Sequence, residues 1–421
     1  MNSDVTRFAV VWAASLLSGV GSALTGFVLG VWVYQSTSSP TQFALVLLCG
    51  LVPGILVGPV AGVLVDRFDR RVVLVVTDCL AAAPTLAVAL LAGADLLAVW
   101  HVCVATAITA ACAAVHLTTY QAMTPLLIPE RHLARANGLM QVAWAAQIAA
   151  PVLAGALMVG VGLAGVLLID LATFAVAVLT LLVVRLPATV VKAPSPERGH
   201  FSEGWRHLRS RPELLGLVLV QSGFNFAFAT AGVLVQPLIL SFADAGVLGV
   251  LMLAGGAGMF CGSLVMGAWG GPRDRIGGMA VFMGVGCVAL FLHTLQPSPL
   301  LVGAAAATFL FTLPVVNGCA QAVLQSAVDR DLLGRVLGTA NSLGSAATPV
   351  AYLLAAPFAE FVTGPLLMPD GALAGSFGAL VGTGPGRGIA FVLLLDAVLL
   401  AALALVTALR LRQGVRDAAR I

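Results

Sequence analysis

The feature that constrains this chain most is a succession of apolar segments, each long enough to cross a bilayer. Hydrophobic residues make up 60% of the 421 residues and charged residues only 9%. A soluble domain carries about 25% charged residues, so this chain lacks the polar side chains to cover several soluble domains. Lipid is therefore the expected solvent. A cytosolic enzyme, a nucleic-acid-binding protein and a disordered chain are excluded.

Glycine, proline and clusters of charge divide the chain into twelve apolar runs. A helix needs about 20 apolar residues to span the hydrocarbon core. Only helices and closed barrels satisfy the backbone in lipid, and runs this long and uniformly apolar are helices. The sequence therefore predicts an all-α polytopic membrane protein. Its twelve predicted transmembrane helices are 8–34, 42–65, 72–92, 97–121, 138–160, 162–184, 213–239, 246–269, 276–294, 298–323, 334–362 and 388–409.

The basic residues give these spans an orientation. When the N-terminus is placed in the cytoplasm and successive spans alternate, 20 of the 21 Lys and Arg residues fall inside, and only Arg387 lies outside. Cytoplasmic loops are enriched in Lys and Arg, so both termini are predicted to be cytoplasmic. The chain is expected in a bacterial cytoplasmic (inner) membrane as a multi-pass protein. The outer segment 363–386, which is rich in glycine, is expected to be a flexible surface loop.

The two halves of the chain resemble each other at an offset of 200 residues. Leu133-Ala134-Arg135-Ala136-Asn137-Gly138 precedes span 5, and Leu333-Gly334-Arg335-Val336-Leu337-Gly338 precedes span 11. An internal repeat of this length is typical of alternating-access transporters, whose substrate binds between the halves. We expect two six-helix bundles related by pseudo-twofold symmetry. The predicted divisions are an N-terminal bundle (1–186), a cytoplasmic linker with a short amphipathic segment around Trp205 (187–211) and a C-terminal bundle with a cytoplasmic tail (212–421).

The loop between spans 2 and 3 reads Gly62-Val63-Leu64-Val65-Asp66-Arg67-Phe68-Asp69-Arg70-Arg71. An Asp at a helix end, followed by clustered Arg, can form a charge network that latches two helices. A plain topology anchor would explain the arginines but not the glycine. The segment resembles the loop 2–3 signature of the major facilitator superfamily, with Asp in place of its second Gly. Pro129–Gly138 and Ile169–Phe174 also resemble the branch of macrolide-efflux and enterobactin-type exporters.

That resemblance implies roles for several residues. In the family the loop 2–3 network closes the cytoplasmic side of the outward-facing state. Asp78 lies 7 residues past Arg71, about 10 Å along a helix, and could join it. Span 5 carries Pro151 and Gly155, which resemble the family's antiporter motif and favour export; a simple packing kink is the alternative. The predicted cytoplasmic gate consists of Gly62, Asp66, Arg70, Arg71 and Asp78.

Ionisable groups within the spans are costly in lipid and are functional candidates by default. Asp78, His116 and Asp170 are the candidates for carrying a coupling proton, and the sequence does not rank them. In the fold that the chain resembles, spans 6 and 12 are peripheral, so Asp170 and its counterpart Asp396 are also interpreted as structural groups bonded within their own bundles. His293 is expected to reach the membrane surface.

Span 7 places polar and aromatic side chains on one helical face, because Gln221, Phe224, Asn225 and Phe228 stand at offsets of 0, 3, 4 and 7. Uncharged amides beside aromatic rings suit a large, mostly apolar ligand. Hydrogen bonding between helices is the alternative, and it is favoured for the Ser15, Ser18, Ser22 and Thr25 stripe of span 1. The other predicted cavity residues are Gln141, Trp144, Gln147, Phe309, Asn317, Asn341 and Tyr352.

These features together predict a secondary active transporter that exports a bulky amphipathic small molecule (a drug, a macrolide or a siderophore-like metabolite) by proton antiport. An importer of the same fold for a small apolar or weakly polar solute is the alternative. The single lysine, Lys192, lies outside any phosphate-binding loop, so a nucleotide-driven pump is excluded. No enzymatic activity, cofactor, metal site or nucleic-acid partner is expected. The expected partners are the lipid bilayer, the substrate and protons, and the protein is expected to be a monomer.

Overall fold

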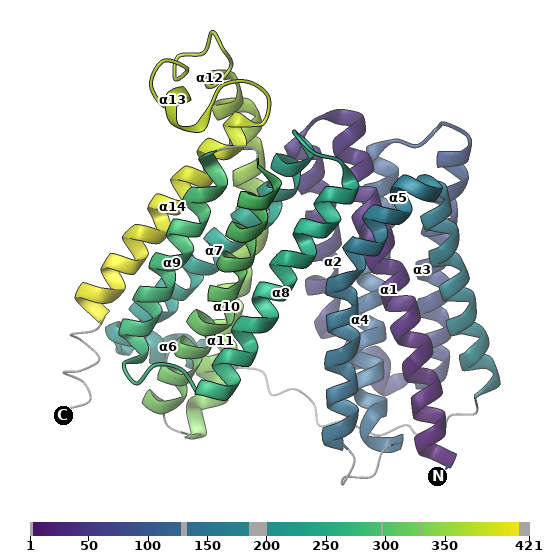
Figure 1. Ribbon diagram of the computed structural model, residues 1–421. Coiled ribbons are helices and arrows are strands. Elements are labelled where there is room, and N and C mark those ends of the chain that lie inside the picture. The colour runs from purple at the N-terminus through teal and green to yellow at the C-terminus, as the bar shows by residue number, and fades with distance from the viewer. Residues whose placement is uncertain (1–2, 128–132, 185–199, 296–297, 329, 412–421) are drawn as a thin grey trace. The chain divides into compact units, whose positions relative to one another are not determined.

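A computed structural model describes residues 3–127, 133–184, 200–295, 298–328 and 330–411. Every regular element in these residues is helical (Figure 1). Eleven of their helices are long and apolar enough to cross a membrane. One of these, in α5 (Leu133–Val183), covers two predicted spans, which meet at Gly162 with φ 69° and ψ −176°. The predicted all-α polytopic fold class is confirmed.

Two compact units make up the chain. Unit 1 consists of Met1–Ser195 with Ala245–Val250, and unit 2 consists of Pro196–Asp244 with Leu251–Ile421. The predicted division at the 187–211 linker remains a prediction. Besides α5, unit 1 contains α1 (Ser3–Thr37), α2 (Pro40–Arg67), α3 (Arg70–Gly93) and α4 (Val99–Leu127). In it α1 packs against α5, and α2 packs against α4.

Unit 2 holds the remaining elements. Here α9 packs against both α10 and α14, while α7 packs against α11 and α14. The elements are α6 (His200–Ser210), α7 (Pro212–Leu240), α8 (Ala245–Trp269, whose first residues group with unit 1), α9 (Arg275–Leu295), α10 (Pro299–Ala327), α11 (Arg330–Pro357), the π-helix η2 (Phe358–Thr363), α12 (Gly364–Leu366), α13 (Gly378–Val381), α14 (Arg387–Val406) and the π-helix η3 (Thr407–Leu411).

Local sequence explains where several helices begin. Ser39 precedes α2, and its side chain accepts a hydrogen bond from the Gln42 amide at 3.1 Å. Asp69 precedes α3, and its Oδ1 accepts from the Arg71 amide at 2.8 Å. Both are N-caps that satisfy amides left open in the first helical turn. The Asp that departs from the family signature in loop 2–3 therefore begins the next helix.

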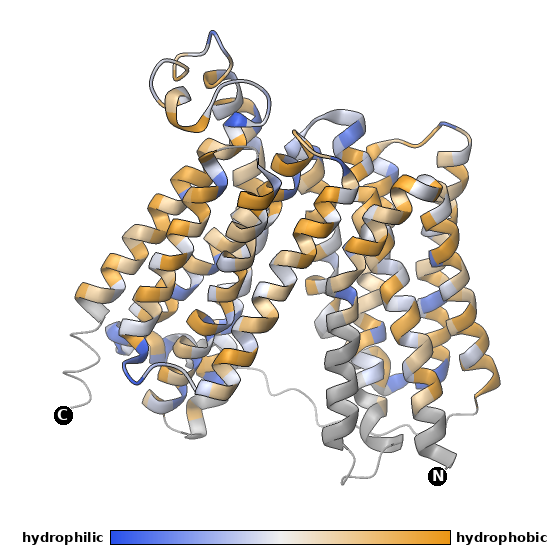
Figure 2. Ribbon diagram, in the orientation of Figure 1, coloured by the Kyte–Doolittle hydropathy of each residue, from blue (hydrophilic) through white to orange (hydrophobic). Residues whose placement is uncertain are grey.

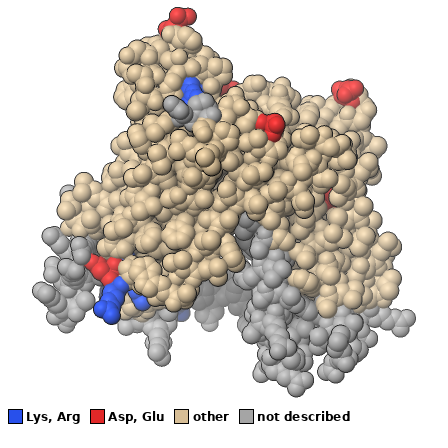
Figure 3. Space-filling view, in the orientation of Figure 1, with Lys and Arg blue, Asp and Glu red and all other residues tan. Residues whose placement is uncertain are grey.

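Apolar side chains both fill the interiors of the units and cover their outer surfaces. Leu74 and Phe224 are fully buried, whereas Leu300 and Val183 are 84% and 80% exposed. Figure 2 shows hydrophobic residues along the lengths of the helices and hydrophilic ones mainly near their ends. On the face drawn in Figure 3, almost all charged residues outside the grey regions lie near helix ends. Such surfaces are stable against lipid and not against water.

The segment before α14 has a defined fold, which corrects the expectation of a flexible loop. It forms α12, α13 and turns beyond the N-terminal end of α14 (Figure 1). Leu367 and Val381 are fully buried in it. The Gly384 amide donates to the Leu367 carbonyl at 2.9 Å, and Arg387 donates to the Val381 carbonyl at 3.0 Å. Several glycines form the turns of this segment. A glycine-rich composition is also typical of flexible linkers, which is why the sequence suggested a flexible loop.

The amphipathic segment expected around Trp205 is the helix α6, which packs against α11. Glu203 of α6 forms an ion pair with Arg335, the arginine of the second copy of the internal repeat. A Cβ atom on Gly204 would overlap the Arg335 carbonyl, so a glycine is required for this close approach. The end of the predicted linker is thereby fixed to the bundle of unit 2.

Candidate functional site

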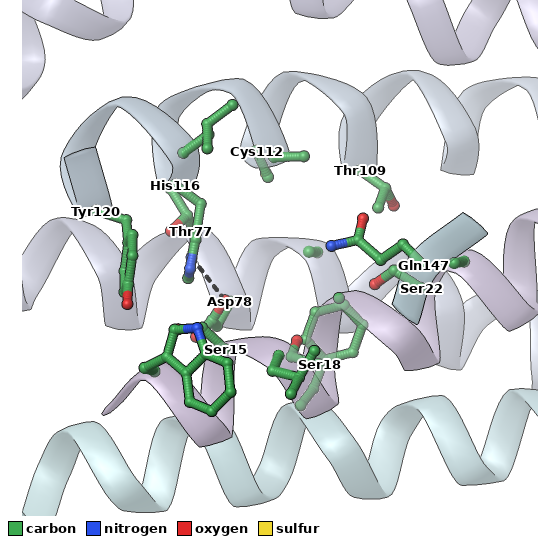
Figure 4. A pocket seen from close by; sticks show the side chains of 18 residues that line it. Ser15, Ser18, Ser22, Thr77, Asp78, Thr109, Cys112, His116, Tyr120 and Gln147 are labelled. Carbon is green, nitrogen blue, oxygen red and sulfur yellow. Dashed lines mark ion pairs between the residues drawn. The ribbon is translucent and has the colours of Figure 1, made fainter. Parts of the chain in front are cut away.

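Unit 1 contains a cavity of about 440 Å³ between α1, α3, α4 and α5 (Figure 4). Its walls are mostly apolar, and hydroxyl, amide, carboxyl and imidazole groups interrupt them. A concave, mostly apolar site with a few polar groups is the usual form of a small-molecule binding site. The lining residues include Trp12, Ser15, Leu16, Ser18, Ser22, Thr77, Asp78, Thr109, Cys112, His116, Tyr120, Gln147 and Phe174.

The cavity wall carries an acid–base pair. Asp78 of α3 and His116 of α4 approach within 3.1 Å, between Oδ1 and Nδ1 (Figure 4). The Asp78 side chain is 5% exposed and that of His116 is 21% exposed. Asp78 Oδ2 is buried and has no hydrogen-bond partner. A nearly buried carboxylate needs a polar partner, and the His116 imidazole lies within reach of it. The pair therefore places a carboxyl and an imidazole group beside the cavity.

Three serines of α1 line the same cavity. Ser15, Ser18 and Ser22 belong to the stripe for which hydrogen bonding between helices was the favoured interpretation. The fourth member, Thr25, does bond between helices: its hydroxyl donates to Asp170 Oδ2 at 2.7 Å. The stripe therefore divides between cavity lining and packing. Gln147 of α5 also lines the cavity, whereas the side chains of Gln141 and Trp144 lie outside the described residues.

Asp170 does not lie on the cavity wall. It is 1% exposed, and besides Thr25 it is approached by the Thr173 hydroxyl, 3.4 Å from Oδ1. These hydroxyls bond the carboxyl within its own unit, as the structural interpretation expects. Of the three candidates for proton coupling, only Asp78 and His116 border the cavity.

Unit 2 contains a second cavity, of about 360 Å³, between α7, α10 and α11. Its lining groups carry no charge. Gln221 donates to Asn317 at 3.2 Å, and Gln321 donates to Asn341 at 2.9 Å. A site of this kind recognises hydroxyl, carbonyl or ether groups and has no counter-charge for an ion. The lining residues include Gln221, Asn225, Phe228, Asn317, Gln321, Asn341, Ser345 and Thr348.

The aromatic residues predicted for this cavity separate into different environments. Phe228 lines it and stacks on Phe309, with ring centroids 5.6 Å apart. Phe224 and Phe309 are buried in the core, and neither they nor Tyr352 is among the lining residues. Sequence reasoning missed Gln321, although it stands one helical turn after Asn317, at the spacing that the span 7 face already showed.

The predicted gate is described only in part. Arg71 donates through Nε to the Leu181 carbonyl at 2.6 Å and through its terminal nitrogen to the Leu182 carbonyl. It thus ties the start of α3 to the end of α5. Arg70 is 9% exposed. The side chain of Asp66 and the surroundings of Gly62 lie outside the described residues.

Other predicted features have defined positions. Pro151 and Gly155 lie within α5. His293 is 2% exposed and contacts the Ala289 carbonyl of its own helix at 3.0 Å, which contradicts the expectation that it reaches the membrane surface. Within the part of the chain that the structure describes, no three His, Cys, Asp or Glu residues gather as metal ligands.

The fold and the cavities define a multi-pass membrane protein that can bind small molecules. Residues 11–352 match the sequence profile of the Major Facilitator Superfamily. This match covers most of the chain, which therefore belongs to that superfamily and is a transporter by family. The predicted family is confirmed.

Several known proteins similar to this chain carry names that refer to efflux. It is 26% identical to macrolide efflux protein A of Streptococcus pyogenes over 367 residues, which cover 85% of this chain and 91% of that protein. It is also 26% identical to the multidrug efflux pump Tap of Mycolicibacterium fortuitum over 82% of this chain and 88% of that protein. A bacterial homologue of the human lysosomal transporter Spinster, in an inward-facing conformation, matches 99% of both chains with a TM-score of 0.72 at 14% identity, which shows the shared fold.

Proposed function

We propose that this protein exports a bulky amphipathic small molecule across the bacterial cytoplasmic membrane in exchange for protons. The observation that carries the proposal is the unit 1 cavity, which combines apolar walls with the Asp78–His116 pair. Apolar walls bind the hydrophobic part of a substrate, and the pair offers an exchangeable proton at the same place. The names of the efflux relatives support this direction of transport.

Competition at Asp78 explains how substrate and proton exchange. When His116 is protonated, it supplies the counter-charge of Asp78 and the two side chains form an ion pair. A substrate that donates a hydrogen bond to the carboxylate replaces part of that interaction, so His116 releases its proton more readily. Protonation of the pair, in turn, expels the substrate. By linkage, each ligand lowers the affinity for the other, as antiport requires.

The charges of the loops support a topology with both termini in the cytoplasm. In this orientation the loop 2–3 part of the predicted gate (Gly62, Asp66, Arg70 and Arg71, without Asp78) lies on the cytoplasmic side. We propose that this gate, with the hydrogen bonds of Arg71 to the end of α5, closes that side during alternating access. The two bundles, with a linker at 187–211, act as a monomer.

Transport into everted membrane vesicles tests the function. We expect a macrolide or a cationic dye to accumulate in the vesicles when a proton gradient is imposed, and to leak out when an uncoupler is added. Asp78→Asn should abolish the accumulation while membrane insertion is unchanged. The matched control is Thr109→Val, because the Thr109 hydroxyl borders the cavity but bonds to its own helix.

Uptake confined to right-side-out vesicles would reject export in favour of the import alternative. Accumulation that persists in Asp78→Asn would remove the pair from the proton path.

A further inference from the structure

The interface between α7 and α14 repeats the arrangement of Thr25 and Asp170. A Cβ atom on Gly223 would lie 3.1 Å from Leu403, so these two residues face each other at one level. The two helices are antiparallel, because α7 is an odd-numbered span and α14 an even-numbered one in the predicted topology. Thr230 lies seven residues after Gly223 on α7, and Asp396 lies seven residues before Leu403 on α14. Seven residues are about two turns, or about 10 Å, so both lie on the same helical faces as Gly223 and Leu403. Asp396 is the counterpart of Asp170 in the second bundle.

The two pairs differ in their hydrogen bonding. Asp170 accepts from Thr25 at 2.7 Å, whereas Asp396 Oδ2 and Thr230 Oγ1 are both buried without a hydrogen-bond partner. Asp396 is 4% exposed and Thr230 is 3% exposed. A charged carboxylate is strongly disfavoured in such an apolar setting without a donor, and a protonated carboxyl is not.

We propose that Asp396 is a second proton-carrying residue, which holds an exchangeable proton and gives it to water during the transport cycle. Thr230 is its positioning residue: its hydroxyl stabilises the carboxyl when α7 moves closer to α14. The coupling role rests on the proposed proton antiport, but the protonated state of Asp396 does not.

The α7 helix connects this carboxyl to the amide-lined cavity of unit 2. Gln221, Asn225 and Phe228 line the cavity on one face of α7. Gly223 and Thr230 each follow a lining residue by two positions, about 200° around the helix, and so lie on the opposite face. A substrate that displaces α7 from the cavity side therefore changes the distance between Thr230 and Asp396. This gives substrate binding a mechanical route to the proton.

The described titratable groups on and around α14 do not form an ion pair with Asp396. His293 of α9 contacts its own helix, and Arg387, at the start of α14, donates to Val381. Among the described residues, no ion pair includes Asp396. The remaining groups on the elements packed against α14 are Glu213 of α7, Arg275 and Cys287 of α9, Glu360 of η2 and Arg410 of η3. The Arg410 side chain is outside the described residues.

Infrared spectroscopy of the purified protein in lipid nanodiscs tests the protonated state. The carbonyl stretch of a protonated carboxylic acid should be present at neutral pH and disappear on alkaline titration. It should be lost in Asp396→Asn and retained in the matched variant Asp170→Asn and in Asp396→Glu. An unchanged band in Asp396→Asn would overturn the proposal.

Proteoliposome transport tests the coupling role. At an imposed gradient of one pH unit, each exchanged proton multiplies the accumulation ratio by about ten. Asp396→Asn should therefore lower the ratio about tenfold while exchange of substrate without a gradient continues. Thr230→Val should shift the pH at which the infrared band disappears, and Thr25→Val should not. An unchanged ratio would overturn the coupling role. A wild-type protein without proton-driven transport, but with a titrating Asp396 band, would refute the proposed function alone.

Discussion

Asp78 and His116 should stabilise the folded protein as a coupled pair, so the effects of removing them should not be additive. The distance between them allows the coupling free energy to be worked out. At 3.1 Å and an effective dielectric constant of about 20, opposite unit charges attract by about 5 kcal/mol. Desolvation of the carboxylate offsets much of this attraction, and partial exposure of the imidazole screens the rest. Contacting groups of this kind show coupling energies of about 0.5–3 kcal/mol. We expect about 2 kcal/mol.

The measurement is a double-mutant cycle of Asp78→Asn, His116→Ala and both together, followed by reversible unfolding in mixed micelles. His116→Ala should be the more damaging single change, at about 3 kcal/mol, because it leaves a buried carboxylate without its counter-charge. Adding Asp78→Asn should restore part of that loss.

Additive effects, within about 0.5 kcal/mol, would refute the reasoning. The pair would then be a geometric contact without energetic coupling, and a proton on His116 would not be linked to Asp78. Thr109→Val serves as the control, since its hydroxyl bonds to the Ala105 carbonyl and not to either partner. It should be additive with both changes.

Three further changes have defined outcomes. Gly204→Val should push α6 away from Arg335, cost about 1–3 kcal/mol and speed proteolytic cleavage of α6. Asn225→Ala should change the substrate profile in a resistance panel more than it changes expression, because it removes an amide from the unit 2 cavity. Arg71→Lys should reduce transport several-fold in vesicles, because a lysine cannot donate in the fixed fork that reaches Leu181 and its neighbour.

The helical fold could be predicted because the signal is local. A run of apolar residues of sufficient length is a helix in lipid whatever surrounds it, and the predicted spans coincide with helices throughout the described residues. The sequence did not predict that spans 5 and 6 would join in a single helix interrupted at one residue. Gly162 alone leaves helical geometry there, and nothing in its neighbours distinguishes it from the many other glycines of the chain.

The cavities could be predicted only one helix at a time. On α7, Gln221, Asn225 and Phe228 line the unit 2 cavity, whereas Phe224 is fully buried. At about 100° per residue, Phe224 lies farthest to one side of the predicted face, which explains the difference. The contact between Asp78 and His116 could not be predicted from helical periodicity. His116 lies 38 positions away on another helix, and periodicity says nothing about which faces of two helices meet.

The internal repeat gave the two units the same scaffold but not the same chemistry. Unit 1 has the Asp78–His116 pair on its cavity wall, and in the proposed mechanism a substrate acts on the proton there by direct competition. Unit 2 lines its cavity with amides, and Asp396 is not among the lining residues, so in the proposed mechanism a substrate there acts on the carboxyl by moving α7. Direct competition depends on the substrate's own donor groups, whereas helix displacement depends mainly on its bulk. A transporter that combines both can couple protons to molecules of varied chemistry, provided that each is large enough to displace α7.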